Sequence, residues 1–454
     1  MLKTNYKEFE NDLGEILREF GELSNYEFSV LGNFEGDKFI VSTEINDKKW
    51  EYNYDFIFSD ELEKKRLLKR YLKISLYKSL TFYFERNLPW GSLTGIRPTK
   101  LAYQYIENNE DFESKFLKEL LVSKSKTEIV KKIINAQKPY YEKNDDNCDF
   151  FVGIPFCPSR CAYCSFLSNE IAKEKNIKEY IDALIKEIEG SKKLVKNLRS
   201  VYIGGGTPVS LKTEDFLRVL DAIGKVDVEY TVEAGRPDVI TEENLKIMKE
   251  YGVTRVCVNP QTFSDETLQK LGRRHTAKEC KEKYALVKSF GFDVNMDLIA
   301  GLIGEDFDTF KNSLDTAISL NPENITVHTL ALKRGSRLRE SVDRLTENEV
   351  SKMVEYAHSA LEKAGYSPYY LYRQKYMAGN LENTGYAKKG KECIYNIDIM
   401  EEIAQIIASG ANAVSKQVEN AKNKIERVGA PKDIKTYIDK IDQVLDKKFN
   451  LYNK

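Results

Sequence analysis

The sequence predicts an α/β protein whose central part, residues 148–345, is an incomplete (β/α)6 barrel. Six short apolar runs occur in this part, and stretches with helical periodicity separate them. Apolar runs of this kind are typical of strands that are buried on both faces, and crossover helices make such strands parallel. Six units of this type fit an open barrel better than a flat doubly wound sheet. We therefore expect the chemistry at the carboxyl ends of these strands.

The regions on either side of this core have different patterns. Residues 1–147 combine a helical segment with alternating, aromatic-rich runs such as KFIVSTEI, which predicts an α+β domain. Residues 346–454 are expected to be mainly helical. A single hydrophobic core stops growing at roughly 250–300 residues, so a chain of 454 residues should contain several domains. The predicted domains are residues 1–147, 148–345 and 346–454.

Charge balance and hydropathy argue against several classes of protein. Lys and Arg number 70 and Asp and Glu number 71, so we expect no basic face that would bind nucleic acid. The amino terminus is charged throughout, and no stretch reaches the roughly 18 apolar residues of a membrane span. We expect a cytoplasmic protein without a membrane span. In reducing cytosol, clustered cysteines indicate metal binding or catalysis.

Three of the seven cysteines lie within eight residues, in VGIPFCPSRCAYCSF. Cys157, Cys161 and Cys164 have the spacing C-x-x-x-C-x-x-C and follow the first predicted strand of the core. Three thiolates can bind three irons of a [4Fe-4S] cluster and leave the fourth open for the amino and carboxylate groups of S-adenosylmethionine (SAM). A closed zinc site needs four ligands, and the sequence has no second C-x-x-C pair. The pattern therefore favours an iron–sulfur cluster over zinc. The remaining cysteines are expected to be inert thiols: Cys148, Cys257, Cys280 and Cys393.

Polar residues and glycines follow the later predicted strands. The run GGGTP contains Gly205, Gly206 and Thr207, and its glycines let the backbone approach a ligand closely. Alone this run could be an ordinary turn, but beside the cysteine loop it is predicted to bind the SAM amino group. The other candidates at strand ends are Glu233, Asn259, Gln261, Arg273 and Asp297, with His328 as a candidate for a substrate pocket. The carboxylates can accept from ribose hydroxyls or the amino group, and the arginine can pair with the SAM carboxylate. Each alone would more often be a helix cap or a solvated loop residue, but their shared placement at strand ends favours a site.

Six motifs together resemble a known family. They are GIPFCPSRCAYCSF, YIGGGTP, VEAGRPD, NPQTF, LGRRH and NMDLIAGL. In this order they resemble the oxygen-independent coproporphyrinogen III oxidase (coproporphyrinogen dehydrogenase) branch of the radical SAM superfamily. WGSLTGIRPTK before the core, and YYLYRQKYMAGNLENTGY and CIYNIDIMEE after it, make the chain similar to HemZ-type members.

The resemblance implies a radical SAM barrel, a HemN-like C-terminal region at residues 346–454, and a [4Fe-4S] cluster and SAM as cofactors. It implies cluster ligands at Cys157, Cys161 and Cys164. The implied SAM contacts are Gly205, Gly206, Thr207, Glu233, Gln261, Arg273 and Asp297. The implied activity is that of an oxidoreductase of haem and porphyrin biosynthesis, which oxidatively decarboxylates two propionates of coproporphyrinogen III to vinyl groups. Its partners would be this tetrapyrrole and an electron donor that the sequence does not identify.

Three residues depart from the pattern of the classical oxidase. Phe166 stands where that enzyme has a further cysteine, and Phe151 and Gly153 stand where it has an aromatic hydroxyl and a histidine. Two alternatives therefore stay open: a haem-binding chaperone that retains the cluster and SAM, and another radical SAM protein that modifies a tetrapyrrole. Radical modification of RNA is disfavoured by the neutral charge balance.

Two aromatic-rich segments, residues 90–100 and 369–386, have two interpretations. Their rings could pack at domain interfaces, or they could form a wall for a flat macrocycle. In the second interpretation, basic side chains would pair with the propionates. These side chains are Arg97, Lys100, Arg373 and Lys375.

Overall fold

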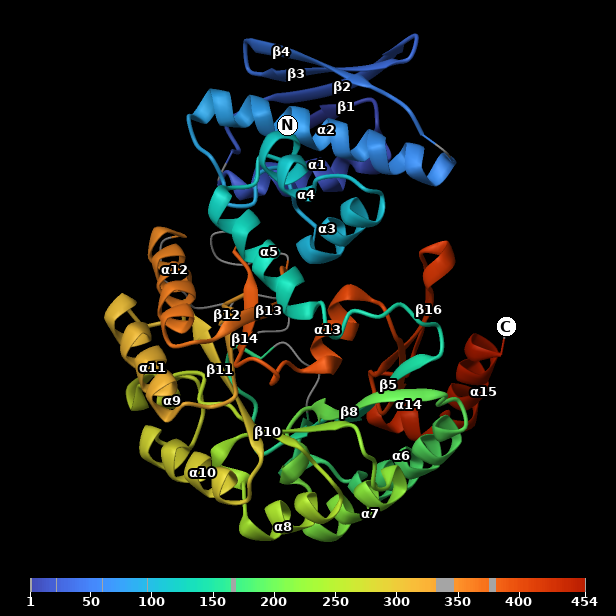
Figure 1. The fold of residues 1–454 in the computed structure, drawn as a ribbon, viewed down its shortest axis with the longest axis vertical. Coiled ribbons are helices and arrows are strands. Elements are labelled where there is room, and N and C mark those ends of the chain that lie inside the picture. Colours follow the sequence, from blue (N-terminus) through green and yellow to red (C-terminus); the bar gives the residue numbers. More distant parts are fainter. Residues whose placement is uncertain are drawn as a thin grey trace. The chain divides into compact units, whose positions relative to one another are not determined.

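The computed structural model describes residues 2–21, 23–58, 60–95, 97–164, 169–331, 347–374 and 381–453. The chain divides into two compact units, each formed mostly by one stretch of the chain, residues 1–131 and residues 132–454 (Figure 1). The boundary falls inside helix α5 (Lys124–Gln137). The three-domain division of the chain stays a prediction.

The first unit has the α+β architecture that its alternating runs predict. Its four-stranded sheet has the order β1-β2-β3-β4, in which β1 is parallel to β2 and the other pairs are antiparallel. The strands are β1 (Leu2–Thr4), β2 (Phe28–Glu35), β3 (Lys38–Ile45) and β4 (Lys48–Asp55). Helices α1 (Glu10–Glu19) and α2 (Glu61–Phe84) pack together, and α2 covers β2, β3 and β4. Asp60 caps α2 by accepting a hydrogen bond from Glu63 N at 2.8 Å, which satisfies a free amide of the first turn.

The first aromatic-rich segment belongs to the core of this unit. Trp90 is fully buried, so its ring is not available to a ligand. Gly91 follows at φ 55°, where an added Cβ would lie 2.2 Å from the carbonyl oxygen of Leu120. The loop therefore packs against the backbone before α5 in the same unit, and packing at a domain interface stays a prediction for this segment. Arg97 precedes α3 (Pro98–Glu107), which begins with proline at its first position.

The second unit contains an 11-stranded sheet with six parallel strands in chain order. These are β5 (Asn147–Ile154), β8 (Asn197–Gly205), β9 (Glu229–Gly235), β10 (Arg255–Val258), β11 (Asp293–Ala300) and β12 (Asn324–Thr329). A (β/α) barrel keeps its strands in this order, whereas a doubly wound sheet reverses it. The connecting helices are α6 (Ile177–Lys192), α7 (Thr213–Ile223), α8 (Glu242–Glu250), α9 (Asp265–Lys270), α10 (Ala277–Ser289) and α11 (Phe307–Leu320). The edge strands of the sheet do not pair with each other in the described part of the chain, so the barrel is incomplete as predicted.

The C-terminal region contains helices, as expected, and also strands that the sequence analysis did not predict. Its helices are α12 (Glu347–Lys363), α13 (Ile394–Glu401), α14 (Ile434–Asp439) and α15 (Ile441–Tyr452). Strands β13 (Ser367–Tyr372) and β14 (Asn383–Ala387) extend the sheet beyond β12, while β15 (Gln405–Ser409), β16 (Val414–Glu419) and β17 (Lys424–Gly429) extend it beyond β5. These short runs become strands because the open edges of the core sheet offer unpaired backbone groups, a tertiary effect that local periodicity does not record.

Buried polar contacts tie this region to the end of β5. Lys448 on α15 forms a fully buried ion pair with Glu187 on α6 at 2.6 Å, and Glu187 also accepts from Gly410 N at 2.7 Å. Tyr180 on α6 donates its hydroxyl hydrogen to the carbonyl oxygen of Gly153 at 2.7 Å. The C-terminal helices therefore help to fix the backbone that enters the cysteine loop.

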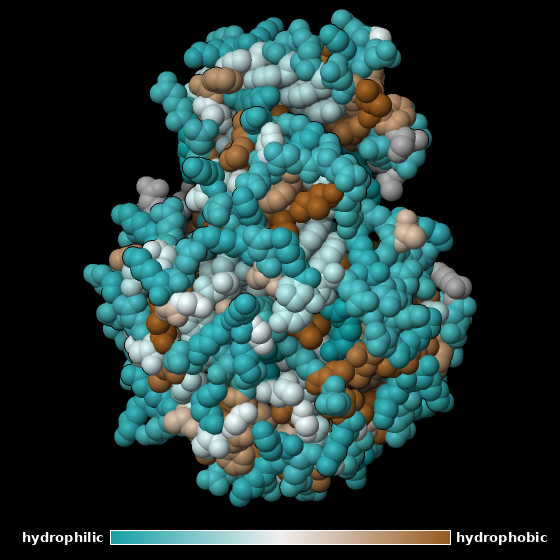
Figure 2. Space-filling model, viewed as in Figure 1, coloured by the Kyte–Doolittle hydropathy of each residue, from teal (hydrophilic) through white to brown (hydrophobic). Residues whose placement is uncertain are grey.

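Hydrophilic side chains cover most of the face shown in Figure 2. Of the helices in the described part of the chain, none combines the length and apolarity needed to cross a membrane.

A candidate cofactor site at the carboxyl ends of the core strands

The three clustered cysteines lie directly after β5. Cys157 ends the short strand β6 (Phe156–Cys157), which pairs with β7 (Asn169–Glu170). Cys161 and Cys164 follow in a turn closed by a hydrogen bond from Cys164 N to Cys161 O at 3.1 Å. All three cysteine side chains are half-buried. Phe166 lies outside the described residues.

The three thiols suit an iron–sulfur cluster. Within the described residues, no three Cys, His, Asp or Glu side chains gather closely enough to hold one ion. Thiolates that bind different irons of a cluster are farther apart than the ligands of one ion, so this finding leaves the cluster prediction in place. The other four cysteines are buried. Burial raises the pKa of the Cys148 thiol to about 11 and that of Cys280 to about 12, as expected of inert thiols.

Two predicted site residues contact the cysteine loop. Thr207 Oγ1 lies 3.6 Å from Cys157 Sγ, and Arg273 Nη1 lies 3.9 Å from Cys161 Sγ. Arg273 is buried and also donates to Tyr163 Oη at 3.0 Å and to the carbonyl oxygen of Asn259 at 2.6 Å. Its guanidinium therefore joins the cysteine loop to the loop after β10. A role as partner of the SAM carboxylate stays a prediction.

The glycine run packs against the start of the cysteine loop. Gly206 N donates to Ile154 O and Thr207 N donates to Phe156 O, both at 2.7 Å. An added Cβ on Gly206 would lie 2.4 Å from the carbonyl oxygen of Phe156, so only glycine fits there. Both N–H groups are therefore occupied by partners within the chain. The amino group of a ligand is a donor, so it would bind the carbonyl oxygens of the run.

Glu233 lies two residues before the end of β9, so it faces the barrel interior and not a loop. Tyr202 Oη donates to Glu233 Oε1 at 2.6 Å, and Gly205 N donates to Oε2 at 3.3 Å. Burial, together with the nearby Asp297, raises the pKa of Glu233 to about 7, although the hydrogen bonds from Tyr202 and Gly205 oppose the rise. This carboxyl group is therefore poised between its protonated and ionised forms near neutral pH.

Asp297 also lies inside its strand, three residues before the end of β11. Burial tends to raise its pKa, but the nearby His328 and a hydrogen bond from Asn295 outweigh burial and hold the pKa below its usual value. Asn295 Nδ2 lies 2.8 Å from Asp297 Oδ1, and His328 Nε2 lies 3.8 Å from Oδ2. Gln261, at φ 69°, donates its N–H to the carbonyl oxygen of Asp297 at 2.9 Å. The structure thus brings Gln261, Asp297 and His328 together.

One buried acceptor fits a polar ligand. Asn259 Oδ1 is buried and has no hydrogen-bond partner among the described residues. Such a group costs free energy unless a water molecule or ligand satisfies it. This observation agrees with the prediction that polar cofactor groups bind at this end of the barrel.

Sequence reasoning missed Arg236, although the motif VEAGRPD contains it. Arg236 is 3% exposed and forms a two-point ion pair with Asp238, with both distances 2.8 Å. Its Nη1 also donates to Ser159 Oγ, between the first two cysteines, at 2.9 Å. The available signal was its position directly after the third core strand, which is where the other site residues were found.

The basic residues proposed for a macrocycle wall have mixed outcomes. Arg373 is 3% exposed, so it presents little surface to a ligand. Lys375 lies outside the described residues. Arg97 and Lys100 belong to the first unit. The wall of cations stays a prediction.

Comparison with known proteins identifies the family. The Radical SAM superfamily matches residues 151–317. The chain is 36% identical over 435 residues to the oxygen-independent coproporphyrinogen-III oxidase-like protein HemZ of Bacillus subtilis, a match that covers 90% of this chain and 86% of that protein. This chain belongs to the HemZ family of radical SAM proteins. The resemblance carried by the six motifs is thereby confirmed.

Two further proteins are similar to this chain. The heme chaperone HemW of Bacillus subtilis is 31% identical over 261 residues, which is 54% of this chain and 65% of that protein. The structure of coproporphyrinogen III oxidase (HemN) from Escherichia coli, a radical SAM enzyme, matches with a TM-score of 0.55 and 20% identity over 68% of this chain and 72% of that one. The last match shows the fold, and it confirms the predicted radical SAM barrel.

Proposed function

We propose that this chain is a radical SAM oxidoreductase that converts propionate side chains of coproporphyrinogen III to vinyl groups. The observation that carries the proposal is the similarity to HemZ, which extends over 90% of the chain and therefore includes regions outside the radical SAM core. The half-buried cysteine loop and the polar barrel interior support it.

Cys157, Cys161 and Cys164 would hold the cluster. SAM would contact Gly205, Gly206, Thr207, Glu233, Gln261, Arg273 and Asp297. When bound, the reduced cluster and SAM supply a 5′-deoxyadenosyl radical, which can remove a hydrogen atom from a substrate carbon. Asp297 is ionised at neutral pH, and it can accept hydrogen bonds from ribose hydroxyls. Glu233 accepts best once it has lost its proton, above about pH 7.

Aromatic rings of the barrel interior suit a flat substrate. Tyr372 Oη lies 3.4 Å from His328 Nδ1, and the Tyr370 and Tyr372 rings are parallel with centroids 6.3 Å apart. Tyr370 is buried, but Tyr372 is half-buried, so part of its ring can contact a macrocycle and exclude water. For each propionate, the overall change is loss of one hydrogen atom, carbon dioxide and one electron. An external donor must therefore reduce the cluster, and an acceptor must take the last electron.

The test is anaerobic turnover. The purified chain is reconstituted with iron and sulfide and incubated with SAM, a reductant and coproporphyrinogen III, and products are followed by mass spectrometry. We expect 5′-deoxyadenosine and vinyl porphyrinogen in proportion. Cys161→Ala should abolish both products and the iron–sulfur absorbance, whereas Cys280→Ala, at a buried cysteine in α10, should retain them. Deoxyadenosine without decarboxylation would refute the substrate and leave the radical chemistry standing.

A second candidate is haem delivery without turnover. It is favoured by the 31% identity to heme chaperone HemW over 54% of this chain. In that case, the reconstituted chain would bind haem stoichiometrically and produce no vinyl porphyrinogen. Haem titration followed by absorbance, with the same preparation used for turnover, distinguishes the two candidates.

A further inference from the structure

Three aromatic rings stack in the barrel interior beside Glu233. Phe151 on β5 and Tyr202 on β8 are register partners, with ring centroids 6.3 Å apart and an interplanar angle of 20°. Tyr395 on α13 stacks on Tyr202 at 4.4 Å and 22°, and on Phe151 at 6.0 Å and 16°. The Tyr202 ring thus packs against two neighbouring rings, which restricts its rotation and the position of its hydroxyl oxygen.

The Tyr202 hydroxyl points at Glu233. Its hydrogen bond to Oε1 is 2.6 Å long, while Gly205 N donates to Oε2 at 3.3 Å. Gly204 leaves room for this carboxyl group, because an added Cβ there would lie 2.8 Å from Oε2. Strand β8 thus supplies a donor to each carboxyl oxygen, which determines the direction of the carboxyl plane.

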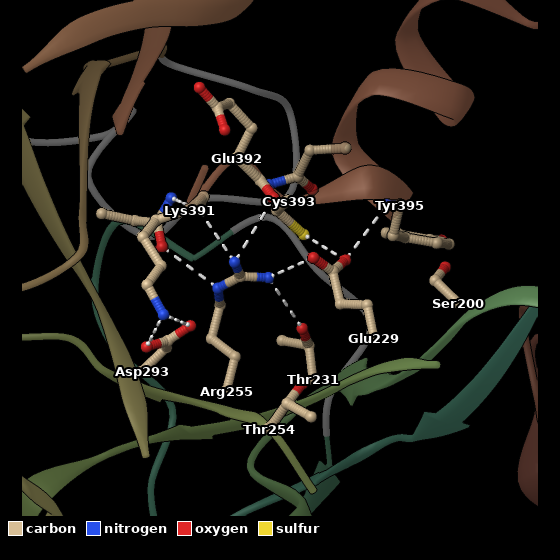
Figure 3. A network of polar contacts seen from close by, with 12 residues as sticks. Ser200, Glu229, Thr231, Thr254, Arg255, Asp293, Lys391, Glu392, Cys393 and Tyr395 are labelled. Atoms are coloured by element: carbon tan, nitrogen blue, oxygen red, sulfur yellow. Dashed lines mark hydrogen bonds and ion pairs between the residues drawn. The ribbon is translucent and has the colours of Figure 1, made fainter. Parts of the chain in front are cut away.

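A polar network holds Tyr395 in place (Figure 3). Tyr395 N donates to Glu229 Oε1 at 3.3 Å, and Arg255 Nη1 donates to Glu229 Oε2 at 2.6 Å. Arg255 Nη2 also donates to the carbonyl oxygen of Lys391 at 2.8 Å. Glu229 and Glu233 are four residues apart on β9, so both side chains face the interior. The first glutamate fixes the segment that carries Tyr395, and the second receives the hydroxyl of the ring stacked on it.

We infer that Tyr202 is a positioning residue, which holds the Glu233 carboxyl group in the orientation and charge state needed to accept hydrogen bonds from a ribose diol. The inference depends on the proposed function only for the identity of the ligand. Tyr202 itself need not touch that ligand, because its hydroxyl is used by Glu233.

Charged and titratable groups on each neighbouring element lie near this carboxyl group. Asp297 on β11 raises its pKa, whereas Tyr202 on β8 and His328 on β12 lower it. Glu233 in turn raises the pKa of Cys257 on β10, Tyr372 on β13 and Tyr395 on α13. Burial raises the pKa of Glu233 to about 7, and the hydrogen bond from Tyr202 opposes that rise. Removal of the hydroxyl should therefore raise the pKa of Glu233 further and leave less carboxylate at neutral pH.

The first test measures the ionisation of Glu233 without any cofactor. The full chain, free of cluster, is labelled with ¹³C at the glutamate carboxyl carbon, and Glu233→Gln identifies the resonance. In Tyr202→Phe we expect the midpoint to rise by about one pH unit. Tyr395→Phe is the matched control, because it keeps the stacked ring and the backbone N–H that donates to Glu229. Equal midpoints in the wild type and Tyr202→Phe would overturn the inference.

The second test measures SAM affinity by equilibrium dialysis of the cluster-loaded chain between pH 6.5 and 8.5. A midpoint raised from about 7 to about 8 lowers the ionised fraction at pH 7 about fivefold, so Tyr202→Phe should bind SAM about fivefold more weakly there. The defect should shrink to less than about twofold at pH 8.5, a recovery that a purely structural defect would not show. Equal affinity of wild type and Tyr202→Phe at every pH would overturn the inference. If the midpoint shifts but the wild type binds no SAM, the proposed function fails and the positioning of Glu233 stands.

Discussion

Glu229 and Glu233 occupy the same face of β9, yet their surroundings differ. The Glu229 side chain is 10% exposed and contacts the buried guanidinium of Arg255 at 2.6 Å, with Cys393 and Tyr395 as further donors. Glu233, nearer the carboxyl end, receives hydrogen bonds from a neutral hydroxyl and a backbone amide. A positive partner stabilises a carboxylate, whereas burial with neutral donors leaves its protonation open to change. The amino edge of the barrel is thus a closed structural network, and the carboxyl edge keeps groups that can respond to a ligand.

The largest effect should come from breaking the closed network. Arg255→Met leaves Glu229 buried without its positive partner and should lower the free energy of unfolding by about 3–5 kcal/mol. This loss in the free energy of unfolding is measured by urea denaturation, with circular dichroism as the signal. The double variant Arg255→Met with Glu229→Gln should be less destabilised than Arg255→Met alone. If both are equally unstable, the ion pair does not explain the effect.

A smaller effect, and one that depends on pH, should come from Glu233→Gln. The pKa of Glu233 is about 7 in the folded chain and 4.5 ordinarily, so the folded state binds the proton more tightly than the unfolded state. The wild type should therefore lose stability as pH rises from about 4.5 to 7, by about 3 kcal/mol. Glu233→Gln removes this loss, so its stability relative to wild type should improve by that amount between pH 4.5 and 8.

Urea denaturation at pH 4.5 and at pH 8 checks the direction in which the stability of Glu233→Gln changes relative to wild type. Glu229→Gln provides the comparison, because that side chain is paired with Arg255 and should show no such gain at pH 8. A stability difference between wild type and Glu233→Gln that stays constant with pH would contradict the assigned pKa.

The smallest effect should come from the thiol in the closed network. Cys393 Sγ donates to Glu229 Oε1 at 3.2 Å, and Cys393→Ala should cost about 1 kcal/mol, because the carboxylate keeps its contact with Arg255. Thermal unfolding is measured for two variants. Cys393→Ala removes a thiol that donates to a carboxylate, and Cys280→Ala removes another buried thiol. Equal losses would mean that packing and not the hydrogen bond accounts for the cost.

Much of the candidate site could be predicted because its residues lie in short contiguous motifs. The spacing of Cys157, Cys161 and Cys164 is a local property, and Thr207 and Arg273 do lie beside this loop. Glu233 and Asp297 were expected at strand ends, but they lie inside their strands and face the interior. The error arises because an apolar run does not mark where the backbone hydrogen bonds of a strand end.

The partners of these residues could not be predicted in the same way. Nothing in YIGGGTP indicates that Tyr202 donates to Glu233, and nothing in CIYNID indicates that Tyr395 stacks on Tyr202. Arg236 was quoted in a motif, but its contact with Ser159 joins segments from different strands. Such contacts depend on which elements become neighbours in the folded chain.

The sequence by itself determined the alternation of strands and helices, the cysteine spacing and the family, because each depends on local periodicity or on ordered motifs. Only the tertiary structure decided that C-terminal strands extend both edges of the core sheet and that α13 places an aromatic ring beside Glu233. The physical reason is that pairing and stacking energies are gained between residues far apart in the chain. A local pattern records which residues can be buried, but it does not record what they are buried against.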